Sequence, residues 1–446
     1  MDKEYLINDK PARALALFTL PMIIGNLFQQ FYTMADSVIV GRFVSEDALA
    51  AIGASYSFTN VFICIAIGGG VGATVITSHY LGARNYKKMI QSTCTALISF
   101  LILSIVLAAL GLVYGRTFMI YLNTPENILD MASDYLQIYF WGLPFLFMYN
   151  VISAIFNAIG KSRIPLYLLI FSSLLNIALA VFMVYSLGLG VKGAAWATFM
   201  AQGVSVVLSF LLLIREFKKY ASYLETAFDT SALTEMSKVA LPSILQQSTV
   251  AIGMLLVQSV VNSFGSEVLA GFSSAMRVES LFIVPMAAIG NAMSSYTAQN
   301  LGAGKQDRVQ KGFRAANGYI VFFAVITCII LEFFHTPIVR LFLGGGGTEL
   351  AFQTGTGYLK FMGFFFILIG LKMSTDGLLR GAADMKMFTI ANFANLALRV
   401  IIALTMAPRF GVSMVWYAVP IGWLVNLVIS FCQYRTGKWK KLSTGR

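Results

Sequence analysis

Residues 14–40 of the chain read ALALFTLPMIIGNLFQQFYTMADSVIV, and this stretch contains one charged side chain, that of Asp36. A helix that crosses the hydrocarbon core of a bilayer needs ~20 predominantly apolar residues. The stretch is therefore predicted to form a transmembrane helix. It is too long for the apolar region of a signal peptide, so we expect it to stay in the protein.

Eleven further apolar segments of similar character follow along the chain. They do not alternate apolar and polar residues as the strands of a membrane β-barrel do. The sequence thus predicts an all-α integral membrane protein with twelve transmembrane helices. The eleven segments cover residues 48–78, 92–115, 132–159, 165–187, 193–214, 238–263, 269–298, 317–334, 356–380, 387–407 and 412–434.

The composition agrees with a chain that is surrounded by lipid. Of its 446 residues, 58% are hydrophobic and 12% are charged, whereas soluble domains carry about 25% charged residues. The net charge of +12 comes from basic residues in short clusters between the apolar segments, which favours membrane topology over nucleic-acid binding as its cause. The four cysteines lie singly, so their spacing indicates neither a disulfide framework nor a metal site.

The distribution of lysine and arginine predicts the orientation in the membrane. If the N-terminus lies inside, the inner segments hold 23 of these residues and the outer loops hold 5. Cytoplasmic segments of membrane proteins carry such an excess of basic residues. We therefore expect a multi-pass protein of the plasma membrane, the inner membrane in a bacterium, with both termini in the cytoplasm.

The two halves of the sequence repeat each other. Leu81-Gly82-Ala83 recurs as Leu301-Gly302-Ala303 and Trp196 recurs as Trp416, each 220 residues later, while Pro21 recurs as Pro242. Because six helices form each copy, both copies enter the membrane from the same side, and a cavity is expected between them. The sequence predicts two pseudo-symmetric six-helix lobes, 1–220 and 221–446, joined by a linker at about 215–237.

Polar residues follow one face of the first predicted helix, namely Asn26, Gln29, Thr33 and Asp36. Their spacing of i, i+3, i+7 and i+10 places them on one stripe. Ionisable groups inside transmembrane helices are costly and are usually functional, so we expect the stripe to line a substrate cavity. Pro21 and Gly25 precede it, and because proline permits a kink, they are the predicted hinge. The alternative is a structural Asp36 that hydrogen-bonds between helices.

Three charged residues inside predicted helices of the second half form a candidate polar network. Asp376 lies between Lys372 and Arg380 at spacings of i, i+4 and i+8, which an ion-pair ladder on one helix explains without function. Arg399 lies at mid-membrane depth, and a buried unpaired arginine is unfavourable. We therefore expect Arg399 to pair with Glu279 or with Asp376.

The sequence resembles the multidrug and toxic compound extrusion (MATE) family over essentially its whole length. The residues that carry the resemblance are Leu20-Pro21, Gln29-Gln30, Ala35-Asp36-Ser37-Val38-Ile39-Val40-Gly41, Ala48-Leu49-Ala50-Ala51, Leu81-Gly82-Ala83 and Leu379-Arg380-Gly381-Ala382-Ala383-Asp384. The resemblance implies cation-coupled efflux, with substrate bound between two six-helix lobes. We expect an antiporter that exports cationic or amphipathic organic compounds, works as a monomer and uses no cofactor other than the coupling ion.

The resemblance also implies an ion site in the first lobe. Asp36 stands where the family keeps the acid tied to proton or sodium coupling, and Asn176 and Thr198 resemble its other oxygen ligands. Ala180, however, occupies a position where the family has an acid. The seventh helix carries Gln246, Gln247 and Gln258 but no glutamate. Both departures favour protons over sodium, with sodium at Asp36 as the alternative.

Other functions remain open from the sequence. A flippase for a lipid-linked precursor shares the two-lobe plan, but it is expected to have a strongly cationic central cavity, and four basic residues lie within the helices. A major-facilitator carrier also has twelve helices, but residues 80–88 lack its glycine-rich motif. An intramembrane enzyme needs paired catalytic groups, whose spacing is not seen, so no catalytic residue is predicted. A channel also remains open from the sequence, and passive conductance in place of stoichiometric ion-coupled flux would distinguish it from a transporter.

Overall fold

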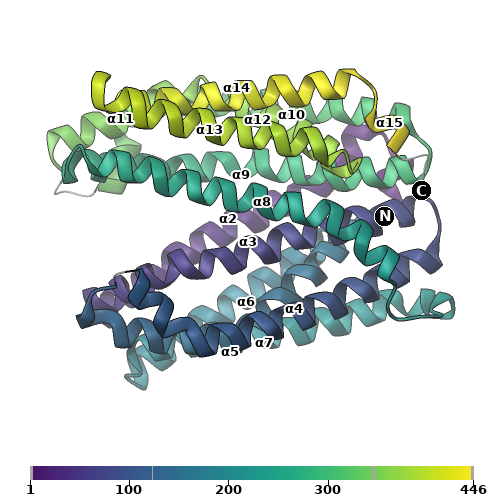
Figure 1. Ribbon diagram of the computed structural model, residues 1–446, viewed down its shortest axis with the longest axis horizontal. Coiled ribbons are helices and arrows are strands. Elements are labelled where there is room, and N and C mark those ends of the chain that lie inside the picture. The colour runs from purple at the N-terminus through teal and green to yellow at the C-terminus, as the bar shows by residue number, and fades with distance from the viewer. Residues whose placement is uncertain (1–3, 123, 344–346, 443–446) are drawn as a thin grey trace. The chain divides into compact units, whose positions relative to one another are not determined.

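The computed structural model describes residues 4–122, 124–343 and 347–442, without the side chains of residues 35–43, 46, 49, 57, 441 and 442. Within these residues the chain is helical and has no β-strand, which confirms the predicted all-α fold (Figure 1). The helices of the first half are α1 (Tyr5–Asn8), α2 (Pro11–Phe43), α3 (Glu46–Gly82), α4 (Tyr86–Tyr121), α5 (Glu126–Ala158), α6 (Arg163–Val181), a π-helical stretch (Phe182–Ser186), α7 (Gly190–Phe217) and a 3-10 helix (Lys218–Tyr223).

The second half repeats this order of long helices. It comprises α8 (Thr230–Asn262), α9 (Ser266–Gly302), α10 (Gln306–Leu343), α11 (Glu349–Gly363), α12 (Phe366–Gly381), α13 (Met385–Phe410), α14 (Ser413–Arg435) and the short α15 (Trp439–Leu442). Eleven of the described helices are long and apolar enough to cross a membrane, and α11 with α12 makes a twelfth span if the pair is counted as one. The predicted number of spans is reached only through this pair.

The tenth predicted segment, 356–380, is not one straight helix. The structure divides it into α11 and α12, whose axes differ by 55°. Gly363 ends α11, and glycine is among the poorest helix formers. Because both halves of the break are apolar, the hydropathy of the segment did not indicate it.

The described chain packs into two compact units, which do not coincide with two consecutive stretches of sequence. One unit contains residues 24–244, and the other contains residues 1–23 together with residues 245–446. The chain passes between the units inside α2, beside Pro21 and Gly25, and inside α8, beside Pro242. The lobes 1–220 and 221–446 describe the repeat in the sequence and stay a prediction.

The repeat in the sequence reappears in the way two pairs of helices are joined. After α3 the backbone of Arg84 adopts a φ of 55°, and after α9 the backbone of Gly304 adopts a φ of 71°. The next amide then bonds back to the helix, from Asn85 to the Tyr80 carbonyl at 3.0 Å and from Lys305 to the Asn300 carbonyl at 2.8 Å. A left-handed residue with this return bond is a common helix ending, and here it occurs at equivalent positions of both halves.

The N-terminal segment packs within the same unit as the second half. Arg308 of α10 donates hydrogen bonds from Nη2 to the carbonyl oxygens of Asp9 at 2.6 Å and Leu6 at 3.3 Å. Asn300 Nδ2 donates to the Leu6 carbonyl at 3.1 Å, and Lys305 Nζ donates to the Ile7 carbonyl at 3.2 Å. The bonds to Leu6 and Ile7 satisfy carbonyls of α1, which a helix end leaves without intrahelical partners, and the bond to Asp9 holds the residue that follows α1.

Candidate functional site

The predicted stripe on α2 is described only in part. The side chain of Asp36 lies outside the described residues, so its surroundings are not given. Asn26 is half-buried, whereas Gln29 and Thr33 are exposed on the protein surface, and the Thr33 hydroxyl donates to the Gln29 carbonyl at 2.9 Å. Pro21 lies inside a continuous helix. The cavity-facing stripe and the hinge therefore stay predictions.

Asn176 and Thr198 are brought together by α6 and α7. Asn176 Nδ2 donates a hydrogen bond to Thr198 Oγ1 at 3.0 Å, and the Thr198 hydroxyl donates to the Ala194 carbonyl at 3.1 Å. Asn176 is 2% exposed, and its buried carbonyl oxygen Oδ1 has no hydrogen-bond partner among the residues whose side chains the structure describes. Buried polar atoms are almost always paired, so this acceptor has the capacity to bind a cation or a donor.

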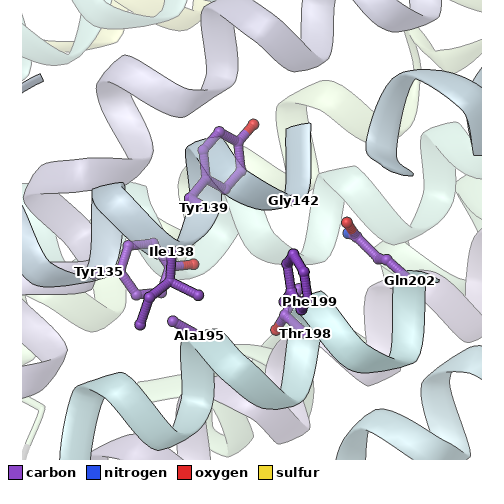
Figure 2. Close-up of a pocket in the computed structure, with 8 residues that line it drawn as sticks. All are labelled: Tyr135, Ile138, Tyr139, Gly142, Ala195, Thr198, Phe199 and Gln202. Carbon is purple, nitrogen blue, oxygen red and sulfur yellow. The ribbon is translucent and has the colours of Figure 1, made fainter. Parts of the chain in front are cut away.

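Thr198 also lines a pocket between α5 and α7 (Figure 2). The lining residues are Tyr135, Ile138, Tyr139 and Gly142 from α5, and Ala195, Thr198, Phe199 and Gln202 from α7. Both sets have the spacing i, i+3, i+4, i+7, which is one face of a helix. The pocket thus lies between two facing helix stripes that combine aromatic rings with a hydroxyl and an amide.

The α5 side of this pocket was missed by the sequence reasoning. The hydroxyl of Tyr139 donates to the Thr59 carbonyl of α3 at 3.3 Å, which fixes the ring against a third helix. The repeating spacing of Tyr135, Tyr139 and Gly142 was a usable signal. It was passed over because aromatic residues are common on both lipid-facing and cavity-facing sides of membrane helices.

The described side chains near Asn176 offer neutral oxygen ligands. Asn176 Oδ1 and Thr198 Oγ1 are suitable for a hard cation, but Ala180, one turn after Asn176, is fully buried and supplies no carboxylate. The described residues contain no group of three or more His, Cys, Asp or Glu that could hold a metal ion. Any negative ligand for a coupling ion has to come from another helix.

Glu279 of α9 lies in a separate buried cluster of the second half. It is 4% exposed and accepts a short hydrogen bond from the hydroxyl of the fully buried Tyr358 of α11. Arg399 of α13 interacts electrostatically with both Glu279 and Tyr358. Among the described residues Arg399 forms no ion pair with Glu279 or with Asp376, and its Nε is buried without a hydrogen-bond partner. The pairing of Arg399 with one of these two carboxylates therefore stays a prediction, with Glu279 as the carboxylate that interacts with it electrostatically.

Asp376 of α12 has a different partner. Lys372 Nζ lies 3.1 Å from Asp376 Oδ2, and both side chains are buried. Arg380 donates from Nη2 to Asn291 Oδ1 of α9 at 2.7 Å. Of the predicted ion-pair ladder on this helix, the pair Lys372–Asp376 is present. Among the described residues Arg380 forms no ion pair with Asp376 and bonds to Asn291 instead.

Comparison with known proteins gives matches over the whole fold. The MatE family model matches residues 21–182 and 242–405, one stretch in each half. Two proteins of Bacillus subtilis (strain 168), "Probable multidrug resistance protein YpnP" and "Probable multidrug resistance protein YoeA", are 28% and 25% identical to this chain; they align over 96% of it and over 96% and 94% of their own lengths. A solved structure described as the outward-facing conformation of a multidrug resistance MATE family transporter has a TM-score of 0.89 at 24% identity and covers 99% of each chain.

Proposed function

Because the chain belongs to the MatE family of multidrug efflux transporters, we propose that it exports cationic or amphipathic organic compounds in exchange for protons. Its relatives are transporters rather than enzymes, and the names of the curated relatives do not favour a flippase for lipid-linked precursors. Membership of the family supports the substrate class, and the buried polar atoms of α6 and α7 support the coupling ion.

The observation that carries the proposal is the unpaired carbonyl oxygen of Asn176. It is held by the hydrogen bond to Thr198, a residue that also lines the pocket between α5 and α7. An acceptor without a donor favours a positively charged or donating partner. The pocket itself has a volume of about 20 Å³, which is room for about one water molecule or a small ion and not for an organic compound. The pocket therefore supports the ion in this proposal, and the family supports the substrate class.

The proposed cycle places the exchange on Asp36. An ionised Asp36 favours the state that holds a cationic substrate, and a proton arriving from outside removes this preference. Intramembrane carboxylates commonly relay protons in transporters. Bending of α2 near Pro21 and Gly25 then accompanies release. A proton is favoured over sodium because Ala180 leaves the Asn176 region without the second carboxylate that a sodium site would use.

The protein is proposed to work as a monomer in the plasma membrane with both termini in the cytoplasm. The lysine and arginine distribution of the sequence supports this orientation. The bacterial origin of the relatives supports the plasma membrane.

The decisive experiment measures efflux of a fluorescent organic cation from proteoliposomes under separately imposed proton and sodium gradients. We expect the proton gradient alone to drive export. Asp36→Asn mimics the protonated carboxyl and is expected to insert normally and to lose gradient-driven export. Asp130→Asn, which removes an exposed carboxylate paired with Arg116, serves as the matched control and is expected to keep it. Full export by Asp36→Asn with unchanged ion dependence would refute the mechanism.

A further inference from the structure

A second buried polar centre lies in the unit that contains α9 to α14, apart from the pocket of α5 and α7. It is built from three helices, of which α13 and α14 run side by side (Figure 1). Its members are Lys372 and Asp376 of α12, Asn392 and Asn395 of α13, and Asn426 and Ser430 of α14, all of them buried.

The ammonium of Lys372 contacts two other members of this centre. Its nitrogen is 3.1 Å from Asp376 Oδ2 and 3.0 Å from Asn392 Oδ1. The other carboxylate oxygen of Asp376 accepts from the Ser430 hydroxyl at 2.8 Å, and Asn392 Nδ2 lies 3.4 Å from Asp376 Oδ2. Two of the three ammonium hydrogens thus have oxygen acceptors of the kinds that hard cations take as ligands, a carboxylate and an amide carbonyl.

The set of oxygens is larger than the lysine needs. Among the residues that the structure describes, the amide oxygen Oδ1 of Asn395 is buried without a hydrogen-bond partner. The unpaired atom of Asn426 is its amide nitrogen Nδ2, a donor that does not bind a cation. Asn426 Oδ1 lies 3.4 Å from the Ser430 hydroxyl. An ion pair within one helix requires only Lys372 and Asp376, so the asparagines of two further helices are not explained by that pair alone. They are explained if the centre is shaped for a cation, with one carboxylate charge matching one positive charge.

We propose that Lys372 is a tethered counter-ion that fills a monovalent-cation site on Asp376, so that this unit takes up no coupling ion. The inference rests on the proposed function only in that a coupling ion exists. It assigns that ion to the region of Asp36 and Asn176. In a chain without the lysine, the same oxygens would bind sodium at Asp376.

The test measures thermal unfolding of the purified full-length protein in sodium chloride and in choline chloride at equal ionic strength. The single variant Asp376→Asn is expected to show the same sodium response as the wild-type protein, because Lys372 already occupies the carboxylate of Asp376 in the wild type. Lys372→Met is expected to add a saturable rise in unfolding temperature of about 2 °C in ~0.1 M sodium, by preferential binding to the folded state. Lys372→Arg, which keeps the charge, is the matched control and is expected to add none.

The double variant Lys372→Met/Asp376→Asn is expected to lose the added sodium response. A folded Lys372→Met protein without added response would overturn the proposal. Loss of a wild-type sodium response in Asp376→Asn would also overturn it, and this arm stands even if Lys372→Met does not fold. Because the readout is unfolding and not export, a failure here is distinct from a failure of Asp36→Asn in proteoliposomes.

Discussion

Gly290 of α9 and Gly377 of α12 lie so close that a Cβ atom added to Gly377 would be 2.1 Å from the carbonyl oxygen of Gly290. The approach is reciprocal, since a Cβ added to Gly290 would lie 2.7 Å from the carbonyl oxygen of Met373 on α12. Small residues permit this kind of close backbone packing between membrane helices. The close approach fixes the position of the turn that carries Asp376.

We expect Gly377→Ala to lower the stability of the protein by at least the ~1–3 kcal/mol typical of overpacking, because the methyl group meets backbone rather than a movable side chain. Gly318→Ala on α10 is the control, since a Cβ there has no heavy atom within 4 Å. Thermal unfolding of the two variants in the same detergent checks this prediction. Equal stabilities would contradict the observed helix packing.

Arg308→Ala is expected to detach the N-terminal segment. The substitution removes bonds to the Leu6 and Asp9 carbonyls and to Asn300 Oδ1, the last at 3.0 Å from Arg308 Nε. Hydrogen bonds to charged groups contribute ~1.5–3 kcal/mol, so amide exchange of residues 5–9 is expected to become at least tenfold faster. Hydrogen–deuterium exchange measures this effect, and the exposed Arg314 on the same helix gives the control Arg314→Ala. An unchanged exchange rate would exclude the proposed role of Arg308.

Arg399→Ala is expected to destabilise the protein strongly, because it leaves Glu279 in a buried cluster without its cation. Removing one member of a buried pair costs ~3–5 kcal/mol, and removing both costs less. The double variant Arg399→Ala/Glu279→Gln is therefore expected to regain part of the lost unfolding temperature. Adding Asp376→Asn instead is expected to give no recovery, since Asp376 pairs with Lys372. Additive losses in both doubles would exclude the pairing.

Single cysteines in a cysteine-free protein test the orientation. A cysteine at Arg409, in a predicted outer loop, is expected to react with a membrane-impermeant maleimide added to intact cells. A cysteine at Lys311, in a predicted inner segment, is expected to react only after permeabilisation. Both side chains are exposed in the structure, so local burial does not decide the result. Labelling of the cysteine at position 311 from outside would show that the orientation is opposite to the predicted one.

The hydropathy of the sequence was sufficient to predict the helical membrane fold, because each spanning segment has to be apolar along most of its length. It was insufficient at α11 and α12, where a break of 55° leaves the hydropathy unchanged. The repeat was visible because Leu81-Gly82-Ala83 recurs as Leu301-Gly302-Ala303, and the structure shows that both copies lead into the same kind of helix ending, at Arg84 and Gly304.

The candidate site was only partly predictable. Asn176 and Thr198 were expected together and lie in hydrogen-bond contact. That Lys372 lies against Asn392 of another helix could not be derived, because the spacing within one helix says nothing of which neighbour covers it. The partner of Arg399 was left open for the same reason, since the packing of α9, α11 and α13 decides it.

The passage of the chain between its compact units inside α2 and α8 has a consequence for fragment complementation. A gene cut at the linker yields 1–220, which lacks the residues of α8 up to 244 that pack in its unit, and 221–446, which lacks residues 1–23. Each fragment therefore carries a segment that completes the other fragment's core. If the two fragments are synthesised separately, each is expected to fold only when the other is present. Neither fragment alone is expected to become resistant to protease.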